Sequence, residues 1–156
     1  MEPISTCLWF DGVAEQAADF YVELFPDSRI DEVMHAPVDY PAGKAGDALL
    51  VTFTLAGRRY LGLNGGSGVP FTEAISLSID CADQAEVDHY WNALSAYPEH
   101  EQCGWLKDRF GVSWQVVPRM LPRLLADPDR AKAGRVMTAM MTMKKIDIAA
   151  LEQAAD

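Results

Sequence analysis

The chain has little cysteine and little histidine. Its three cysteines, Cys7, Cys81 and Cys103, lie far apart and form no Cys-x-x-Cys pair. An odd number of widely spaced cysteines argues against a disulfide framework and a zinc knuckle, so we predict reduced thiols in a cytoplasmic protein. The three histidines, at positions 35, 89 and 100, show no spacing typical of metal ligands.

Long apolar runs and an excess of positive charge are also absent. No run approaches the roughly 20 apolar residues of a membrane-spanning helix. The first residues, MEPISTCLWF, carry an acid at position 2 and do not resemble a signal peptide. Lys and Arg number 13 against 23 Asp and Glu, which gives a net charge of −10. Phosphate binding needs clustered Lys and Arg, so the composition argues against a nucleic-acid or membrane partner.

What is present is a globular composition with a regular alternation of strand and helix patterns. The 156 residues, 49% of them hydrophobic, suit one compact domain. Short β-branched and aromatic runs predict strands, and one run with helical spacing predicts a helix. In chain order these are strand 4–10, helix 13–25, strand 29–34, strand 48–55 and strand 58–63, with a Pro- and Gly-rich loop over 36–47. The first half is therefore predicted to be β-α-β-β-β.

The same order begins again after a glycine-rich break over 64–68. Residues 74–80 predict a strand and residues 84–97 a helix. A shift of seventy positions superimposes them on the first strand and the first helix, and it places Phe20 on Tyr90. This weak but consistent self-similarity predicts an internal repeat of one β-α-β-β-β unit.

The C-terminal part of the chain predicts only helices. They cover 121–126, 128–143 and 148–155, with Asp127 and Asp147 as the expected N-caps of the last two. An apolar stripe follows one side of the middle helix: Val136, Met137, Met140 and Met141. Because Met fills irregular gaps, we expect this stripe to pack against the domain or a second subunit.

The stretch Gln102–Pro118 holds the densest group of unusual residues. It contains a Cys103-Gly104 turn, a charged bend and a strand over 112–117, in which Trp114 alternates with Gln115. A polar amide in the middle of an apolar strand usually has a partner, a ligand or a water. Two interpretations stay open at this point: the stretch belongs to a binding site, or it is a well-packed hairpin.

Short motifs spread over nearly the whole chain carry a resemblance to a known family. They are Trp9-Phe10-Asp11-Gly12 with Ala14-Glu15 and Phe20-Tyr21, Leu63-Asn64-Gly65-Gly66, Glu73-Ala74-Ile75-Ser76, Gln102-Cys103-Gly104-Trp105, Trp114-Gln115 and Met143-Lys144-Lys145-Ile146-Asp147. Together with the tandem units they resemble the vicinal oxygen chelate superfamily of glyoxalase, bleomycin resistance and dioxygenase proteins, and within it the PhnB-like branch. Members of this branch are often labelled 3-demethylubiquinone-9 3-methyltransferase. The chain, however, has no strand followed by the glycine-rich loop that a Rossmann-type methyltransferase uses.

The resemblance implies an α+β fold in which two tandem βαβββ units form a cup-shaped, eight-stranded sheet, followed by C-terminal helices. We expect one domain over residues 1–156, with unit one at about 1–66, unit two at about 72–118 and a helical tail over 119–156. Because members of the superfamily usually form dimers, the resemblance also implies a homodimer.

Metal-dependent members of the superfamily hold one divalent ion with His and Glu side chains, and the resemblance places other residues at those positions here. Gln115 stands at one Glu position and Asn64 near the other. Ser76 stands near the second His position, and Thr6 or Leu8 at the first. Amides and hydroxyls lack the charge that makes a tight metal site. We therefore predict no cofactor, and a divalent metal stays an alternative whose ligand positions are lost.

The combined pattern predicts a protein that binds a small organic molecule in the cup, with turnover left open. The expected ligand-binding residues are Gln115, Asn64, Ser76, Trp9, Trp105 and Trp114. The polar groups would orient the ligand and the tryptophans would wall the pocket. Cys103 is a candidate nucleophile and Glu73 a candidate general base, against the alternatives of an inert thiol and a solvated charge. Other functions left open are a sequestering protein of the antibiotic-resistance type, a metal-dependent lyase or isomerase, a methyltransferase and an oligomeric scaffold.

Overall fold

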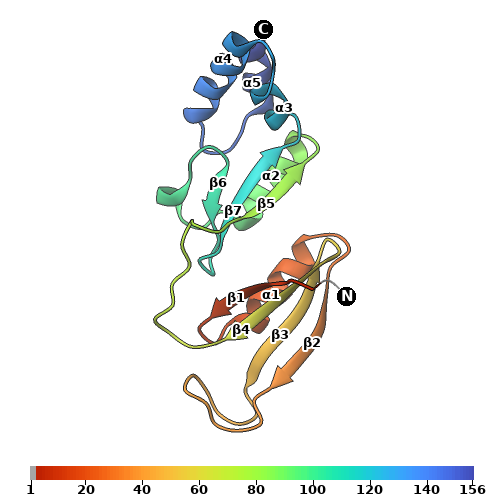
Figure 1. Cartoon of the computed structure of the whole chain (residues 1–156), viewed down its shortest axis with the longest axis vertical. Helices are drawn as coiled ribbons and strands as arrows, with labels where there is room; N and C mark the ends of the chain where they lie inside the picture. The colour runs from red at the N-terminus through yellow and green to blue at the C-terminus, as the bar shows by residue number, and fades with distance from the viewer. Residues whose placement is uncertain (1–2) are drawn as a thin grey trace. The chain divides into compact units, whose positions relative to one another are not determined.

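The structure, a computed structural model, describes residues 3–156. The chain divides into two compact units, Met1–Phe71 and Thr72–Asp156, and each has its own sheet (Figure 1). The described residues form seven strands in two sheets and five α-helices, which confirms the predicted α+β class.

The first unit is a four-stranded sheet with one helix. In chain order its elements are β1 (Thr6–Phe10), α1 (Ala14–Leu24), β2 (Arg29–His35), β3 (Ala48–Leu55) and β4 (Arg58–Asn64). The strand order is β1-β4-β3-β2, with β1 parallel to β4 and the other neighbours antiparallel. Each predicted element of this half is present, because each has a clear period of two or of 3.6 residues.

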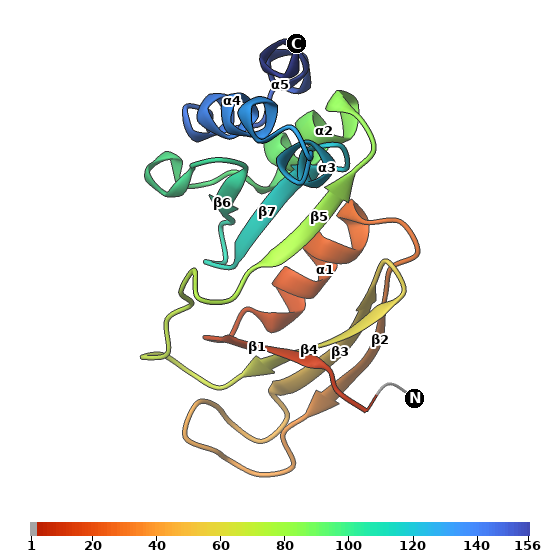
Figure 2. The same ribbon diagram turned by 45° about the horizontal axis from the view of Figure 1, so that its top comes forward.

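Helix α1 lies on one face of this sheet, over β2, β3 and β4 (Figure 2). Its buried side consists mostly of small side chains, and Ala14, Ala17 and Ala18 are fully buried. Small residues let the helix backbone approach the strands closely, as in any dense core. Tyr21 fills the remaining space, with its ring centroid 6.4 Å from that of Phe53 on β3.

The second unit repeats this order with one strand fewer. Its sheet and covering helix are β5 (Leu77–Cys81), α2 (Gln84–Leu94), β6 (Trp105–Lys107) and β7 (Ser113–Pro118). The strand order β5-β7-β6 corresponds to β1-β4-β3, because β5 is parallel to β7 and β6 is antiparallel to it. The stretch Gln102–Pro118 therefore does contain a hairpin, β6–β7, with α2 packed across the sheet.

The expected eight strands are not formed by residues 3–156, because the second unit has no counterpart of β2. Residues 95–104 form a loop in its place, with a short 3₁₀ helix, η1 (Pro98–His100). The loop sequence has no β-branched residue, and Pro98 cannot donate a hydrogen bond to a strand ladder. Helix α2 ends at Leu94 rather than at the predicted position 97, because Pro98 disfavours helical backbone at the residue before it.

The two units differ by one residue in their internal spacing. Helices α1 and α2 begin at residues 14 and 84, seventy positions apart as predicted, whereas β1 and β5 begin at residues 6 and 77, seventy-one apart. Burial agrees with the longer spacing, since Leu8 and Ile79 are both buried. A shift of one residue turns every strand side chain to the other face. With the spacing of seventy-one, Cys7 is the counterpart of Ser78, and Thr6 and Leu8 are the counterparts of Leu77 and Ile79.

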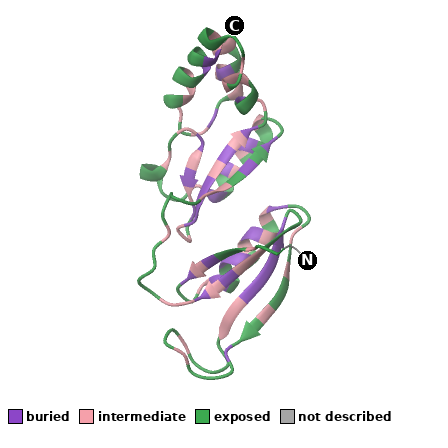
Figure 3. Cartoon of the chain, in the orientation of Figure 1, coloured by how far each residue is buried: buried purple, intermediate pink, exposed green. Residues whose placement is uncertain are grey.

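The buried residues of each unit concentrate on the strands and on the side of its helix that faces them (Figure 3). In the second unit Ile79, Leu106, Trp114 and Val116 make up the strand side of this core. None of the described helices is long and apolar enough to cross a membrane.

Three helices, α3 (Leu121–Leu125), α4 (Arg130–Met141) and α5 (Ile148–Ala155), make up the C-terminal tail. They enclose a small apolar core: Leu121, Val136, Ile146 and Leu151. Asp147 caps α5 as predicted, and its carboxylate accepts the N–H of Ala150 at 3.1 Å.

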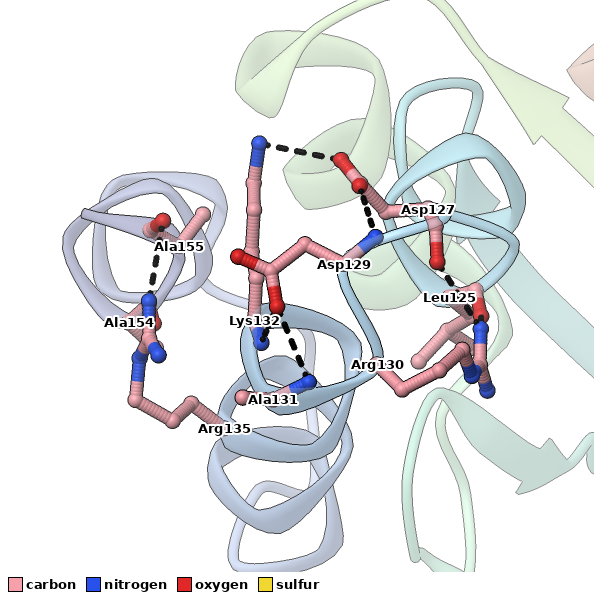
Figure 4. A network of polar contacts seen from close by, with 9 residues as sticks. All are labelled: Leu125, Asp127, Asp129, Arg130, Ala131, Lys132, Arg135, Ala154 and Ala155. Carbon is pink, nitrogen blue, oxygen red and sulfur yellow. Dashed lines mark hydrogen bonds and ion pairs between the residues drawn. The ribbon is translucent and has the colours of Figure 1, made fainter.

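The N-cap of α4 is Asp129, so the predicted cap, Asp127, was wrong by two residues. Asp129 Oδ1 accepts the backbone N–H groups of Ala131 and Lys132 at 3.0 and 3.1 Å (Figure 4). Asp127 instead accepts the N–H of Asp129 at 2.9 Å, and its Oδ2 lies 3.0 Å from Lys132 Nζ. Both acids can cap a backbone N–H, and the sequence alone does not show which one the helix follows.

Within the second unit, the segment 143–147 fixes the tail to α2 and to the turn before β6. The backbone N–H groups of Cys103 and Gly104 donate to two carbonyl groups of this segment, at 2.8 and 2.7 Å. Gln84 on α2 donates to the carbonyl of Ile146 at 3.0 Å and accepts a backbone N–H from the start of α5 at 2.8 Å. The Met-Lys-Lys-Ile-Asp motif therefore has a structural role, because it anchors the helices to the sheet unit.

Candidate ligand-binding site

The side chains of β7 alternate between two different environments. Trp114 and Val116 are buried on the side that α2 covers, at 3% and 0% exposure. Ser113 and Gln115 point to the opposite side, because successive residues of a strand face in opposite directions. The predicted strand thus has one apolar and one polar face.

Strand register extends this polar side across the sheet. Ser78 on β5 and Trp105 on β6 both pair with Gln115, and Lys107 on β6 pairs with Ser113. The resulting surface, which we call the polar face, consists of Ser76, Ser78, Trp105, Lys107, Ser113 and Gln115.

Gln115 and Ser76, two of the predicted binding residues, are hydrogen-bonded to each other. Gln115 Nε2 donates to Ser76 Oγ at 2.9 Å. An amide has a second N–H and a carbonyl oxygen, and a hydroxyl that accepts can still donate. Both residues are only partly buried. The pair therefore leaves hydrogen-bond donors and acceptors available on the polar face.

Ser113 carries a buried hydroxyl with no hydrogen-bond partner among the described residues. It is 2% exposed and lies across the hairpin from Lys107. An unpartnered buried hydroxyl costs about 1–3 kcal/mol, so such a group in a protein usually has a ligand or an ordered water. Ser113 was not predicted as a site residue, although the period-two spacing from Gln115 would have indicated it.

Glu73 contacts Lys107 of the polar face and His100 of the loop before β6. Its Oε1 lies 3.4 Å from Lys107 Nζ and 3.2 Å from His100 Nδ1. The pKa of Glu73 is held below its usual value, first by its own backbone N–H and next by Lys107. A carboxylate with a lowered pKa is a weaker base, so this position favours charge pairing over the general-base role we considered. Neither Lys107 nor His100 was predicted at the site, because their approach depends on the hairpin and on a loop.

Trp114 lies on the opposite face of the sheet from Gln115. Its indole Nε1 donates to the buried carboxylate of Asp108 at 2.8 Å. This placement differs from our expectation that Trp114 and Gln115 line one pocket, because adjacent strand residues cannot share a face. Trp105 is the tryptophan that shares the face of Gln115.

In the first unit, Asn64 connects three elements. It is 7% exposed. Its Oδ1 accepts the N–H of Ala14 at the start of α1, and its Nδ2 donates to the carbonyl of Ala48 at the start of β3, both at 2.9 Å. Asn64 therefore holds the end of β4 against the beginnings of α1 and β3.

Trp9, the other predicted binding residue of the first unit, covers the turn after β4. Its Nε1 donates to the carbonyl of Gly66 at 2.8 Å. A Cβ added to Gly65 would lie 2.3 Å from the indole ring, so glycine is needed there. The contacts of Trp9 within its unit are those of a residue that fixes a turn.

The three cysteines lie outside the polar face. Burial raises the pKa of the Cys81 thiol to about 12, and desolvation also raises the pKa of Cys7 on β1. Both are poor nucleophiles, because the thiolate is the reactive form. Cys103, the predicted nucleophile candidate, sits in a turn with φ of 52°, and its Sγ lies 3.4 Å from the amide nitrogen of Gln102. Its backbone holds the tail, which is a structural role.

The donors of the polar face do not match a divalent metal site. Tight divalent-metal sites use charged carboxylate or thiolate ligands or imidazole, whereas this face offers neutral hydroxyls, an amide and the positive charge of Lys107. The nearby Glu73 carboxylate and His100 imidazole are paired with each other, and Glu73 is also paired with Lys107. At the other expected position, Asn64 uses its side-chain oxygen to accept the N–H of Ala14. Within residues 3–156, no group of three or more His, Cys, Asp or Glu side chains is arranged to hold a metal. The residues present therefore do not fit the ion of the metal-dependent superfamily members.

Comparison with known proteins agrees with the motifs. The family model described as 3-demethylubiquinone-9 3-methyltransferase matches residues 2–117. None of the curated proteins matches the chain. Among solved structures, the PhnB protein from Bacillus cereus, described as a 3-demethylubiquinone-9 3-methyltransferase, is 33% identical; the match covers 75% of this chain and 99% of that one, with a TM-score of 0.63.

A second solved structure supports the fold alone. Protein PA1353 from Pseudomonas aeruginosa is 18% identical, with 74% of this chain and 96% of that chain covered and a TM-score of 0.57. The family match ends at residue 117, before α3 begins at Leu121, so the helical tail lies beyond it. From its sequence match and its fold, the chain belongs to the 3-demethylubiquinone-9 3-methyltransferase family, the PhnB-like branch of the vicinal oxygen chelate superfamily.

Proposed function

We propose that this protein binds a small organic molecule on the polar face of its second unit. The observation that carries the proposal is the Gln115–Ser76 hydrogen bond, because it joins an amide on β7 to a hydroxyl just before β5 in one set of donors and acceptors. The unpartnered hydroxyl of Ser113 supports it, since a ligand would satisfy that group. Trp105, on the same face, offers a flat ring on which an aromatic ligand can stack.

The chemistry of the polar face favours binding without turnover. Its hydroxyl, amide and indole groups form hydrogen bonds but do not exchange protons readily near neutral pH. The nearby carboxylate, Glu73, has a lowered pKa and is engaged with Lys107 and His100. The proposal is therefore a binding or sequestering protein that holds its ligand without a metal. The methyltransferase activity in the family's description is not part of it, because the sequence has no glycine-rich cofactor loop of the Rossmann type.

Two flat aromatic probes test this function: the neutral 2-naphthamide and its anionic analogue 2-naphthoate. We expect saturable thermal stabilisation, with a dissociation constant on the order of 1 mM for ligands of this size. Gln115→Leu removes the amide at nearly constant side-chain size. It should weaken 2-naphthamide binding roughly tenfold, which is the contribution of about one hydrogen bond.

Gln153→Leu is the matched control, because Gln153 is exposed on α5. This variant should bind both probes like the unmodified protein, as measured by thermal shift and titration calorimetry. Failure of both probes to bind, or equal binding by the two leucine variants, contradicts the proposed function.

Other parts of the expected biology stay predictions. A homodimer is supported by Met137 and Met141 on α4, which are 49% and 50% exposed and would be covered by a second subunit. A single domain over residues 1–156, a cup closed by both units and a cytoplasmic location are likewise untested expectations.

A further inference from the structure

The second unit contains a carboxylate-binding arrangement that one of its own side chains occupies. Glu73 Oε1 is the single oxygen that both Lys107 Nζ and His100 Nδ1 approach, at 3.4 and 3.2 Å. The ring of Tyr97 meets the ring of His100 edge-on, with centroids 6.3 Å apart and an interplanar angle of 86°, and this contact helps to orient the imidazole. Two nitrogen donors around one carboxylate oxygen are what a protein site for an organic acid requires.

The two partners of this ion pair differ in burial. The side chain of Lys107 is only 16% exposed, whereas that of Glu73 is 55% exposed. Most of the Lys107 side chain is therefore covered by the protein, which restricts where its ammonium group can go, and a carboxylate within reach stabilises that charge. A half-exposed carboxylate gains little from the pairing, since water already solvates its charge well. Lys107 is therefore the more enclosed partner of the pair, and the exposed Glu73 is the partner that a ligand can displace more easily.

The position of Lys107 links this arrangement to the polar face. Lys107 stands directly across the hairpin from Ser113, whose hydroxyl is buried and has no partner among the described residues. Directly opposed strand residues have Cβ atoms about 4.5–5.5 Å apart, so a group bound by Lys107 can also approach Ser113. Glu73 precedes β5 on an irregular segment, where a side chain can turn away without breaking a strand ladder.

We infer that Lys107 and His100 form a subsite for the carboxylate of the ligand, and that Glu73 fills this subsite until a ligand displaces it. The inference rests on the proposed function and adds the ligand class: small organic carboxylates with a flat apolar part. The ligand's carboxylate takes the place of the Glu73 carboxylate, Ser113 donates to it, and Trp105 and Gln115 contact the remainder. Glu73 then competes with the ligand's carboxylate for Lys107 and His100 and lowers the affinity for the ligand.

The two probes separate this inference from the proposed function, because they differ in charge and hardly in shape. Glu73→Gln removes the competing charge and should tighten 2-naphthoate binding about threefold to fivefold, with 2-naphthamide binding unchanged. Lys107→Met should weaken 2-naphthoate binding at least tenfold and abolish the preference for the anion, whereas Lys107→Arg should keep most of it. Dissociation constants from titration calorimetry at fixed ionic strength give the comparison.

An ion pair outside the polar face supplies matched controls. Lys44 Nζ lies 2.9 Å from Asp39 Oδ2 in the first unit, and both side chains are exposed. Lys44→Met and Asp39→Asn make the same charge changes there and should leave both dissociation constants unchanged.

The dissociation constants of the two probes distinguish the carboxylate subsite from the proposed function. The carboxylate subsite is overturned if 2-naphthamide binds as tightly as 2-naphthoate and if neither Glu73→Gln nor Lys107→Met changes the ratio of the two dissociation constants. In that case the proposed function still stands. If neither probe binds to any variant, both are overturned. If Glu73→Gln raises the affinity for 2-naphthoate and leaves the affinity for 2-naphthamide unchanged, the result supports the inference.

Discussion

Replacing Asp108 with alanine is expected to lower the free energy of unfolding by about 3–5 kcal/mol. Asp108 is fully buried, and its carboxylate accepts the N–H groups of Phe110 and Val112 at 2.8 and 3.0 Å. It also accepts the indole N–H of Trp114 at 2.8 Å. Alanine leaves these donors without this acceptor, and the loss costs about 1–3 kcal/mol for each of the two buried donors, Val112 N–H and Trp114 Nε1–H. A domain has only about 5–15 kcal/mol of stability in all, so a large share is lost.

Urea unfolding followed by tryptophan fluorescence measures this change. Asp39→Ala is the control, because the Asp39 carboxylate also accepts a backbone N–H, from Ala45 at 3.0 Å, but is exposed. It should lower the free energy of unfolding far less than Asp108→Ala does, because water can replace the exposed carboxylate as acceptor. Should Asp108→Ala not fold at all, Trp114→Phe removes the indole donor together with part of the buried ring system and should cost about 1–3 kcal/mol. An Asp108→Ala protein as stable as the Asp39→Ala protein would show that this buried network does not hold the hairpin.

Gly104→Ala is expected to lower the free energy of unfolding by about 2–4 kcal/mol, for two separate reasons. Gly104 has φ of +85°, where a residue with a Cβ is strained by about 1–2 kcal/mol. Its added Cβ would also lie 2.9 Å from the carbonyl oxygen of Val116 and 3.2 Å from Ile146. Relief of this clash moves the tail away from β7, so hydrogen exchange of the tail amides should become faster.

Gly57→Ala isolates the backbone strain from the clash. Gly57 has φ of +80°, and an added Cβ there meets nothing within 4 Å. Gly57→Ala should therefore cost only about 1–2 kcal/mol and leave exchange in the tail unchanged. Equal effects of the two substitutions would contradict the close contact among Gly104, β7 and Ile146.

The elements with a strong local period were predictable, and those set by distant contacts were not. Strand β3 and helix α5 begin and end where the sequence predicts, because apolar spacing and capping residues define them. The missing fourth strand of the second unit was not foreseen, since it depends on what replaces a strand between α2 and β6. The one-residue difference in spacing between the units was also missed, because the aromatic match of the helices concealed it.

The candidate site, too, was predictable only where a local sequence pattern marks a residue. Gln115 was singled out as a polar residue in an apolar strand, and its partner Ser76 was on the predicted list. Trp114 could have been removed from that list by the period of the strand alone. The contacts of Asn64 reach residues 50 and 16 positions away, and no local pattern reveals them. The approach of Glu73 to Lys107 likewise depends on tertiary structure.

The central claim is that the polar face of the second unit is where a small molecule binds. The chain has four tryptophans, and each indole N–H gives one signal in a ¹H–¹⁵N spectrum, assigned through Trp→Phe variants. On titration with 2-naphthoate, we predict a saturable shift of the Trp105 signal, with the signals of the buried Trp91 and Trp114 nearly unchanged. A Trp105 signal that stays in place while the ligand binds would put the site elsewhere and contradict the account.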